Sequence, residues 1–562
     1  MNVKDFKFSE LKYERPDMGN LRSMLQVYIK SFKSAKSFEE ADALFLNYEK
    51  SFEKFETMRT IAHIRNTADM NDKFYESEMQ FFNEEIPKFA VEQSQADRLL
   101  LSSPYRAEFE KKYGVHLIKD IEAQVRLADE KIINERVEEA KLCQKYSKTA
   151  GCCTTVFMGE NCNFYGLLKY MESPDRNLRR NAFLKWAEMY ESISGELDEI
   201  YLKLVELRKA MAKKLGFKNY VDMAYLANGH YYYTADDIAR FRKQVVEVIV
   251  PLSDKLFKAR QKQLGVDALY YYDEMLAYPE GNAVPDGDMQ QLVNSAYEMY
   301  KEMSKESGEF FGFMTDHGLF DLKTREGKHQ GGYCTFLSEY KAPFIFSNFN
   351  GTSADVDVLT HEAGHALQAY LSARTLPLSS QIWATSDVCE IHSMTMEHFA
   401  YPYMDKFFGK NAQKYCRAHL SSAVTTVPYL CLVDHFQHEV YANDFDAKGL
   451  RECWNRLEKI YLPWRNYGGN AFLEGGGFWM QKQHIFLYPF YYVDYALAQI
   501  GAFEYFARSK REPEKAWRDY LSLCRAGGSR GYFELLKCGG LSDPFKDGTV
   551  EKLMKGVAAE LL

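Results

Sequence analysis

The motif that most constrains the fold is His-Glu-Ala-Gly-His at positions 361–365, because its two histidines can bind one metal only if this segment is helical. On an α-helix, residues four positions apart lie one above the other on the same face. Glu362 would point beside the metal, where a carboxylate can accept a proton from water. Residues 355–360 lead into the motif without a proline, which favours a helix. The motif therefore predicts a zinc-binding helix; the alternative is a pair of surface histidines.

A catalytic zinc site has three protein ligands and one open position, so a third ligand must follow elsewhere in the chain. The next helical stretch, residues 387–398, carries Glu390 and Glu397, which are two turns apart and can both face the site. We predict that Glu390 binds the metal and that Glu397 has a supporting role. Asp357, one turn before His361, is predicted to accept the other ring N–H of that histidine. The alternative for Asp357 is an ordinary acidic residue near a helix start.

Two short aromatic segments, residues 331–336 and 343–349, precede the motif and are bounded by glycine and proline, which is typical of β-strands. A strand edge beside a metal helix can hydrogen-bond an extended peptide. We therefore predict that the second segment is such an edge, and that substrate is bound here by Gly332, Phe346, Ser347 and Asn348. The alternative is a structural hairpin packed on helices.

A second cluster with chemical potential lies near the C-terminal end, where glycines at 468–477 precede His484 and a run of tyrosines at 488–495. Phenol and imidazolium groups are good hydrogen-bond donors to a developing oxyanion. The glycines favour a loop that can approach a substrate backbone closely. For each single tyrosine, packing in the core is an equally reasonable interpretation.

The first three hundred residues hold apolar side chains at three- and four-residue spacing, which predicts long helices over residues 21–55, 57–89, 106–143 and 175–216. The stretch 265–285 is less regular. Near residue 328 the composition changes to short aromatic segments. We therefore expect a helical N-terminal lobe over residues 1–327 and a catalytic lobe over residues 328–562, within one continuous unit.

The charge balance of the 562 residues disfavours two classes of partner. The net charge is -8 without any basic block, so neither nucleic acid nor an anionic membrane is expected to bind. Residues 1–7 are charged and lack an apolar signal core, and the longest uncharged run, residues 418–433, is too short to span a bilayer. Eleven cysteines are an odd number, which favours free thiols and a cytoplasmic location.

Several of these motifs together resemble the M3 family of zinc metallopeptidases, and within it the oligoendopeptidase F branch. They are the segment 361–368, the Glu-Ile-His-Ser sequence at 390–393, the aromatic segment 343–349, and the run from His484 to Ala496. The resemblance implies a mainly α, two-lobed helical body with a deep central channel and a small β-sheet beside the active site. It also implies one zinc ion per chain and exclusion of folded proteins from the channel.

The resemblance also implies roles for individual residues. The zinc ligands would be His361, His365 and Glu390, with Glu362 as the general base. The residues that bind substrate and stabilise the oxyanion would be His484, Tyr492 and Tyr495. Because the spacing of this run varies by one residue between branches of the family, Tyr488 and Tyr491 stay as alternatives, with Tyr488 predicted to contact substrate.

The function expected from these observations is zinc-dependent hydrolysis of internal peptide bonds in short, unstructured oligopeptides. Water would attack the peptide carbonyl directly, without a covalent enzyme intermediate. Two alternatives remain. A zinc aminopeptidase would need an acidic group that anchors a free N-terminus. A non-catalytic peptide-binding protein of the same fold would not need Glu362, because metal binding alone does not require that residue.

Overall fold

The computed structural model describes residues 6–329 and 331–562, so the first residues of the charged N-terminal segment discussed above lie outside it. The chain forms two compact units. Unit 1 comprises residues 1–130, 284–412 and 504–542, and unit 2 comprises residues 131–283, 413–503 and 543–562. The predicted boundary between residues 327 and 328 therefore does not coincide with a boundary between the two units, because both residues lie in unit 1. The change in composition at that point lies inside unit 1, between the first and second strands of its sheet, and the chain passes between the two units several times.

The N-terminal part of unit 1 is helical, as predicted. However, a new helix begins inside each of the predicted helices 21–55 and 57–89, although the apolar spacing continues there. The Ser37 side chain accepts a hydrogen bond from the Glu40 amide at 3.3 Å and starts a new helix, and the Asp72 carboxylate does the same for the Phe74 amide at 2.9 Å. These two caps begin the second and third helices. The helices of this part are α1 (Met18–Lys33), α2 (Phe38–Ala68), α3 (Lys73–Leu101), α4 (Arg106–Tyr113) and α5 (Val115–Leu127).

A three-stranded sheet follows in the same unit, with strand order β3–β5–β4. Its strands are β3 (Phe320–Lys323), β4 (Tyr333–Leu337) and β5 (Ala342–Phe349). The two predicted strands are confirmed as β4 and β5, whereas β3 was not predicted. β5 runs parallel to β3 and antiparallel to β4, so Ile345 and Phe346 are paired on both sides. The prediction that β5 is an edge strand is therefore wrong, and the outer edge on that side belongs to β4.

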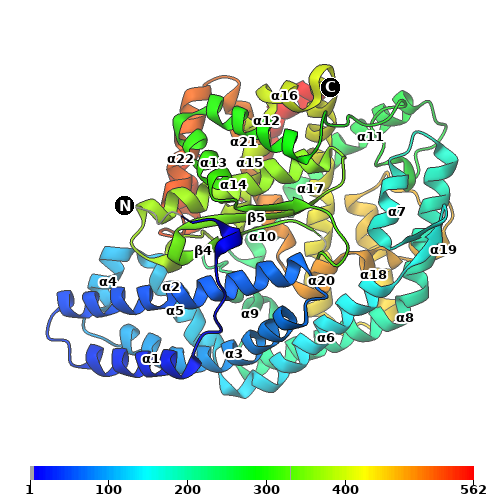
Figure 1. Cartoon of the computed structure of the whole chain (residues 1–562). Helices are drawn as coiled ribbons and strands as arrows, with labels where there is room; N and C mark the ends of the chain where they lie inside the picture. The colour runs from blue at the N-terminus through cyan, green and yellow to red at the C-terminus, as the bar shows by residue number, and fades with distance from the viewer. Residues whose placement is uncertain (1–5, 330) are drawn as a thin grey trace. The chain divides into compact units, whose positions relative to one another are not determined.

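The helix that carries the metal motif, α14 (Ala354–Thr375), begins directly after β5. It packs against β4 and β5 on one side and against α15 (Ser386–Phe399) and α22 (Pro513–Ala526) on others, and Figure 1 shows α14 running beside β5. The turn between strand and helix is fixed by Asp355, whose carboxylate accepts from the Asn350 amide at 2.9 Å and the Gly351 amide at 2.7 Å. The remaining helices of unit 1 are α12 (Met289–Met303), α13 (Lys305–Asp316), α16 (Asp405–Phe408) and α23 (Tyr532–Cys538).

Unit 2 is built mainly from helices around a core of large aromatic side chains. Trp454 and Trp479 are fully buried there, and the Tyr201 ring lies 4.9 Å from the Trp479 ring. Its helices are α6 (Ile133–Cys152), α7 (Phe164–Met171), α8 (Arg176–Lys214), α9 (Tyr220–Ala227), α10 (Ala235–Gln244), α11 (Val250–Leu264), α17 (Ala412–Ala442), α18 (Ala447–Tyr461), α19 (Ala471–Glu474), α20 (Gln483–Leu487), α21 (Tyr492–Ser509) and α24 (Thr549–Leu561). A short antiparallel hairpin of β1 (Thr155–Phe157) and β2 (Glu160–Cys162) completes it.

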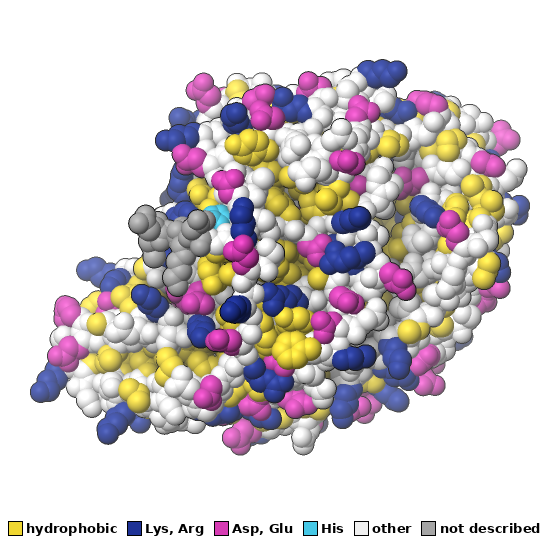
Figure 2. Space-filling model, in the orientation of Figure 1, with side chains coloured by type: hydrophobic (Ala, Val, Ile, Leu, Met, Phe, Trp, Pro, Cys, Tyr) yellow, Lys and Arg dark blue, Asp and Glu magenta, His cyan; other side chains and the backbone are white. Residues whose placement is uncertain are grey.

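The surface charges are mixed in sign. On the face shown in Figure 2, lysine and arginine side chains alternate with aspartate and glutamate over the visible surface. None of the helices in the described parts of the chain combines the length and the apolar character that crossing a membrane requires.

Candidate metal centre and aromatic cluster

The two motif histidines and Glu390 come together in unit 1, as the helical spacing predicts. His361 Nε2 lies 3.2 Å from Glu390 Oε2, and His365 Nε2 lies 3.4 Å from the same oxygen. Within residues 6–329 and 331–562, this is the only group of three or more His, Cys, Asp or Glu side chains whose ligand atoms all lie within 4.8 Å of one another.

These distances fit a tetrahedral zinc site. Zinc–nitrogen and zinc–oxygen bonds of about 2.0–2.2 Å at tetrahedral angles place neighbouring ligand atoms roughly 3.3–3.6 Å apart. The observed separations of 3.2 and 3.4 Å match that spacing. Two imidazoles and one carboxylate are also the ligand set that leaves a fourth position for water or substrate. The residues present therefore suit zinc in both geometry and chemistry.

Close packing of α14 on α15 brings Glu390, the predicted third ligand, to the two histidines. A Cβ atom on Gly364 would lie 2.6 Å from the His392 carbonyl oxygen and 2.6 Å from the Ser393 Cα. Only glycine permits this approach, since real Cβ contacts are not this short. The Ser393 hydroxyl then donates to Glu390 Oε2 at 2.9 Å, which fixes the orientation of the carboxylate. The glycine inside the motif is thus part of how the metal site is assembled.

The second ring nitrogen of His361 contacts Glu397, and the role predicted for Asp357 stays a prediction. His361 Nδ1 lies 2.6 Å from Glu397 Oε1, so the ring nitrogen that Asp357 was expected to hold contacts a side chain of α15. Burial opposes the charged form of His361, but its hydrogen bonds to Glu390 and Glu397 outweigh burial and raise its pKa well above the usual value. Burial alone would raise the pKa of Glu390, yet the charges and hydrogen bonds of His365 and His361 lower it well below its usual value.

Glu362 is buried beside this set, with 7% of its surface exposed. Burial raises the pKa of its carboxyl group, against the lowering effect of His361 and His365. The backbone of Gly332, just before β4, passes next to it. A Cβ atom on Gly332 would lie 3.6 Å from Glu362 Oε1 and 2.9 Å from Val358 Cγ1. A side chain larger than hydrogen would therefore crowd α14 at the position of the predicted base.

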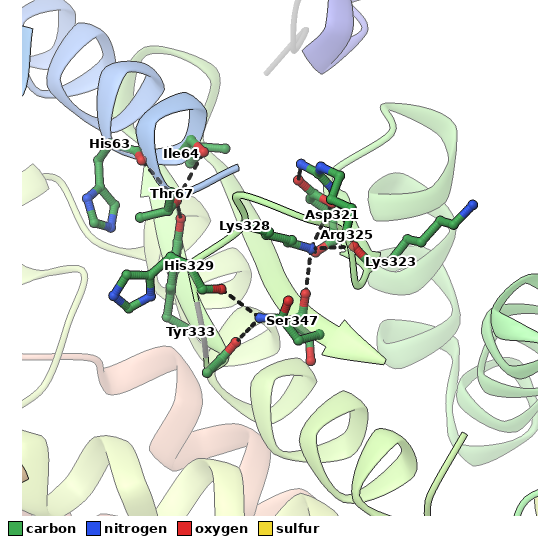
Figure 3. Close-up of polar contacts among 12 residues, drawn as sticks. His63, Ile64, Thr67, Asp321, Lys323, Arg325, Lys328, His329, Tyr333 and Ser347 are labelled. Carbon is green, nitrogen blue, oxygen red and sulfur yellow. Dashed lines mark hydrogen bonds and ion pairs between the residues drawn. The ribbon is translucent and has the colours of Figure 1, made fainter. Parts of the chain in front are cut away.

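A buried lysine that the sequence did not single out holds the loop that leads into β4. In Figure 3 the Lys328 side chain points to the backbone carbonyls of β3 and β5. Its ammonium donates to the Asp321 carbonyl at 3.0 Å, to the Lys323 carbonyl at 3.0 Å and to the Ser347 carbonyl at 2.5 Å, and it also pairs with the Asp321 carboxylate at 2.9 Å. The register between β3 and β5 shifts between Asp321 and Lys323. Lys328 therefore satisfies carbonyls at an irregular point of the sheet, although burial lowers its pKa despite Asp321.

The predicted substrate-binding residues of β5 make contacts within the protein. The Phe346 ring stacks on the Tyr333 ring at 4.7 Å and lies 4.3 Å from the Lys328 ammonium. The Asn348 amide donates to the His329 carbonyl at 2.8 Å and to the Gly331 carbonyl at 2.9 Å. These contacts, with the one at Ser347, brace the loop before β4. A role for them in binding substrate stays a prediction.

The predicted oxyanion residues lie together in unit 2. His484 is on α20, and its ring lies 4.6 Å from that of Tyr492 at the start of α21. The Tyr492 and Tyr495 rings are 5.8 Å apart, and the Tyr491 and Tyr495 rings 5.2 Å apart. Tyr488 is the most accessible, with 55% of its surface exposed. Their functional roles stay predictions.

Two buried features that the sequence did not reveal fix the start of α21. Phe490, in the turn between α20 and α21, has a positive φ of 65°, which is unusual for a bulky residue. Its amide donates to Gln437 Oε1 at 3.1 Å, which holds the turn. Asp494, between the two predicted donors, pairs with His230 at 2.8 Å, and both side chains are fully buried. No sequence motif links His230, a single histidine after α9, to Asp494.

Comparisons with known proteins agree with this arrangement. Residues 169–554 match the family described as Peptidase family M3, and residues 8–128 match the Peptidase M3 N-terminal domain. A relative from Borreliella burgdorferi, named Oligoendopeptidase F homolog, is 22% identical over 395 residues. That alignment covers 68% of this chain but only 64% of the relative, so the chain spans less than two thirds of it.

Two solved structures are similar over nearly their full length. One is PZ peptidase A with an inhibitor, which is 42% identical and has a TM-score of 0.95, with 99% of each chain covered. The other is a structure from Bacillus anthracis assigned to oligoendopeptidase F, which is 38% identical and has a TM-score of 0.90, with 99% of this chain and 98% of that one covered. The mainly helical fold with small sheets is thus shared with both.

Proposed function

Because this chain belongs to peptidase family M3, we propose that it is a zinc-dependent endopeptidase that hydrolyses internal peptide bonds of short, unstructured oligopeptides. One observation carries the proposal: His361 and His365 each lie at the spacing of a tetrahedral zinc site from Glu390, at 3.2 and 3.4 Å, and Glu362 is buried beside them. The names of the similar proteins support the choice of oligopeptides as substrates.

The supporting residues keep this ligand set in place. Glu397 holds His361 through Nδ1, which leaves Nε2 directed toward Glu390. Ser393 holds the Glu390 carboxylate. Such partners of metal ligands fix the tautomer and orientation of the ligands before the metal binds. One zinc ion per chain would be held here.

When bound, zinc would act as a Lewis acid, which polarises the scissile carbonyl and lowers the pKa of water. In our mechanism Glu362 accepts a proton from the attacking water, so that the new C–O bond forms as the carbonyl π-bond opens onto oxygen. Glu362 then delivers this proton to the amide nitrogen as the C–N bond breaks, and is ready for a second cycle. No covalent bond to the enzyme is formed.

Donors to the developing oxyanion are proposed to come from the aromatic cluster of unit 2. Phenol hydroxyls of Tyr492 and Tyr495 and the ring N–H of His484 are suited to this because they gain strength as negative charge grows on the oxygen. Support comes from the mutual contacts of the three rings and from the residues that fix α21, Phe490 and Asp494.

The peptide backbone is proposed to pair with the outer edge of β4 rather than with β5. An extended peptide can add to a free strand edge through main-chain hydrogen bonds, which depend little on its sequence. The observation in favour is that β4 ends the sheet and follows Gly332, whose backbone passes beside Glu362.

The test is to incubate the purified protein with a mixed library of peptides, with and without a metal chelator, and to map cleavage sites by mass spectrometry. We expect internal cuts that disappear on chelation and return when zinc is added. Stepwise loss of N-terminal residues would replace the proposal by an aminopeptidase. If no peptide is cut under any condition, the protein is a peptide-binding member of the family and the proposal is wrong.

A further inference from the structure

A second lysine of interest, Lys482, lies at the aromatic cluster of unit 2. It connects a 3-10 helix (Gly477–Gln481) to α20 and comes just before the helix turn that carries His484. Its backbone is held on both sides, because its amide donates to the Trp479 carbonyl at 3.1 Å and its carbonyl accepts from the Ile485 amide at 3.1 Å. The start of the side chain is therefore fixed relative to the predicted oxyanion donors.

Two aromatic rings hold the Lys482 ammonium. Nζ lies 5.1 Å from the centre of the Tyr492 ring and 5.7 Å from that of the Tyr429 ring. The two rings are nearly perpendicular, at 83°, so they form a notch around the cation. The face of an aromatic ring attracts a cation electrostatically, most strongly where water is partly excluded. The ammonium of this half-buried residue is thus kept beside Tyr492 without the help of a negative charge.

What distinguishes Lys482 is that its charge is not neutralised by the protein. Among residues 6–329 and 331–562, no carboxylate lies within 4.0 Å of its Nζ, and no oxygen accepts a hydrogen bond from it. Lys328, by contrast, is surrounded by three carbonyls and the Asp321 carboxylate. Lys169 also lies over a ring, that of Tyr170 at 4.8 Å, but it pairs with Glu160 at 2.7 Å. Lys482 therefore keeps its N–H donors available for a ligand.

We propose that Lys482 binds a carboxylate of the peptide substrate and so determines which peptides are cleaved efficiently. The inference rests on the proposed peptidase function. An ammonium and a carboxylate form a charge-assisted hydrogen bond, and the anionic groups that a peptide brings are carboxylates. The aromatic walls strengthen that bond because they limit competition from water. The carboxylate can be the C-terminus of a short peptide or the side chain of an aspartate or glutamate.

Matched peptides separate these two sources. One pair has the same sequence and ends in either a free carboxylate or an amide. In a second pair, both with amide ends, single positions flanking the cleavage site carry either glutamate or glutamine. The ratio of kcat/KM within each pair is measured for the wild type, Lys482→Met and Lys482→Arg. Lys169→Met is the control, because it removes a lysine over a tyrosine ring in the same unit that already has its own carboxylate.

We expect Lys482→Met to reduce the preference for the carboxylate-bearing peptide about ten- to a hundredfold in one of the two pairs, the usual effect of losing a hydrogen bond to a charged group. Cleavage of the neutral peptides should stay within about twofold of wild type, because Lys482 does not act on the reacting bond. Lys482→Arg should keep part of the preference, and Lys169→Met all of it. The pair that responds identifies the source of the carboxylate.

Two results would overturn the inference. Unchanged ratios in both pairs for Lys482→Met and Lys482→Arg would show that the ammonium does not recognise a carboxylate. An equal loss of activity on all peptides would show that Lys482 only supports the fold of the cluster, and a lowered melting temperature would accompany it. Both outcomes leave the peptidase function intact, whereas a wild-type protein that cleaves none of the peptides would contradict the proposed function itself.

Discussion

The metal centre and the aromatic cluster differ in how far apart in the sequence the residues lie that hold each of them in place. All three proposed metal ligands come from two consecutive long helices, α14 and α15, and one glycine contact sets the distance between these helices. The aromatic cluster depends on a strained turn at Phe490, on its hydrogen bond to Gln437 of α17, and on the buried pair of Asp494 with His230. Helix geometry thus places the ligands, whereas long-range contacts place the tyrosines.

The consequence of this difference is a different sensitivity to substitution. At the metal centre, each ligand contributes to one irreplaceable function, so removing one should abolish activity. In the aromatic cluster, several rings lie within 4.6–6.0 Å of their neighbours, so the loss of one donor can be compensated in part by another. The predictions below test this contrast, beginning with the largest effect.

The largest effect is expected for Glu390→Ala. Two histidines alone bind zinc far more weakly than three ligands, so both zinc content and peptide cleavage should be lost. Metal analysis after dialysis, together with a peptide cleavage assay, checks this. Zinc content and activity equal to wild type would instead assign the third ligand to Glu397. They would also contradict the expectation that the metal centre is the region more sensitive to substitution.

Glu362→Gln should separate catalysis from metal binding within the same region. Glutamine keeps the shape of the side chain but cannot accept the proton, so kcat should fall by about 10²–10⁴ while zinc content is unchanged. Single-peptide kinetics and metal analysis on the same preparation give both quantities. If more than about a tenth of the activity remained, equivalent to only about 1.4 kcal/mol of barrier, the general base would lie elsewhere.

The same contrast explains how much could be predicted from the sequence. Apolar spacing predicted the helical character of the N-terminal part, and the motif together with Glu390 predicted three side chains that the structure brings close together. Apolar spacing did not reveal where one helix ends and the next begins, because Ser37 and Asp72 act as caps only through hydrogen bonds to the following amides. The four-residue strand β3 was too short to show a periodic pattern.

Partners across the fold were the part that the sequence could not supply. Helical periodicity placed both Asp357 and Glu397 near His361, but only the packing of α15 on α14 decides that Glu397 reaches its ring nitrogen. β5 looked like an edge strand because its second neighbour, β3, was not recognised. The buried position of Lys328 likewise follows from an irregular strand register that no local pattern encodes.

In the aromatic cluster, Tyr495→Phe and Tyr492→Phe are expected to lower kcat about a hundredfold, with little change in KM or melting temperature, because an oxyanion donor acts only in the transition state. His484→Ala should cause a comparable loss. Tyr488→Phe and Tyr491→Phe complete the series. If a tyrosine only packs in the core, its Phe variant should instead be less stable and keep the wild-type kcat. Wild-type kcat in all four Phe variants would show that our interpretation of the tyrosines is wrong.

Gly364→Ala tests whether one packing contact assembles the metal centre. The new methyl group would collide with the α15 backbone at His392 and Ser393, so we expect about 1–3 kcal/mol of destabilisation and weaker zinc binding although no ligand is changed. Gly195→Ala is the matched control, because Gly195 lies inside α8 with nothing within 4 Å of the added atom. That variant should be neutral or more stable by about 0.5–1 kcal/mol. Equal stability and zinc affinity in both variants would contradict the packing argument.

The smallest effect is expected for substitutions of residues that support the ligands. The zinc affinities of these variants decide whether Glu397 or Asp357 orients the His361 ring. Glu397→Gln weakens the hydrogen bond that holds the His361 ring, so zinc affinity should fall about ten- to a hundredfold while cleavage at saturating zinc stays close to wild type. Asp357→Asn should leave zinc affinity within about twofold, because the nitrogen it was expected to hold is bound by Glu397. Competition with a chromophoric chelator measures both variants under the same conditions. The opposite ranking would return the orienting role to Asp357, and it would mean that α15 contributes one side chain to the metal centre instead of two.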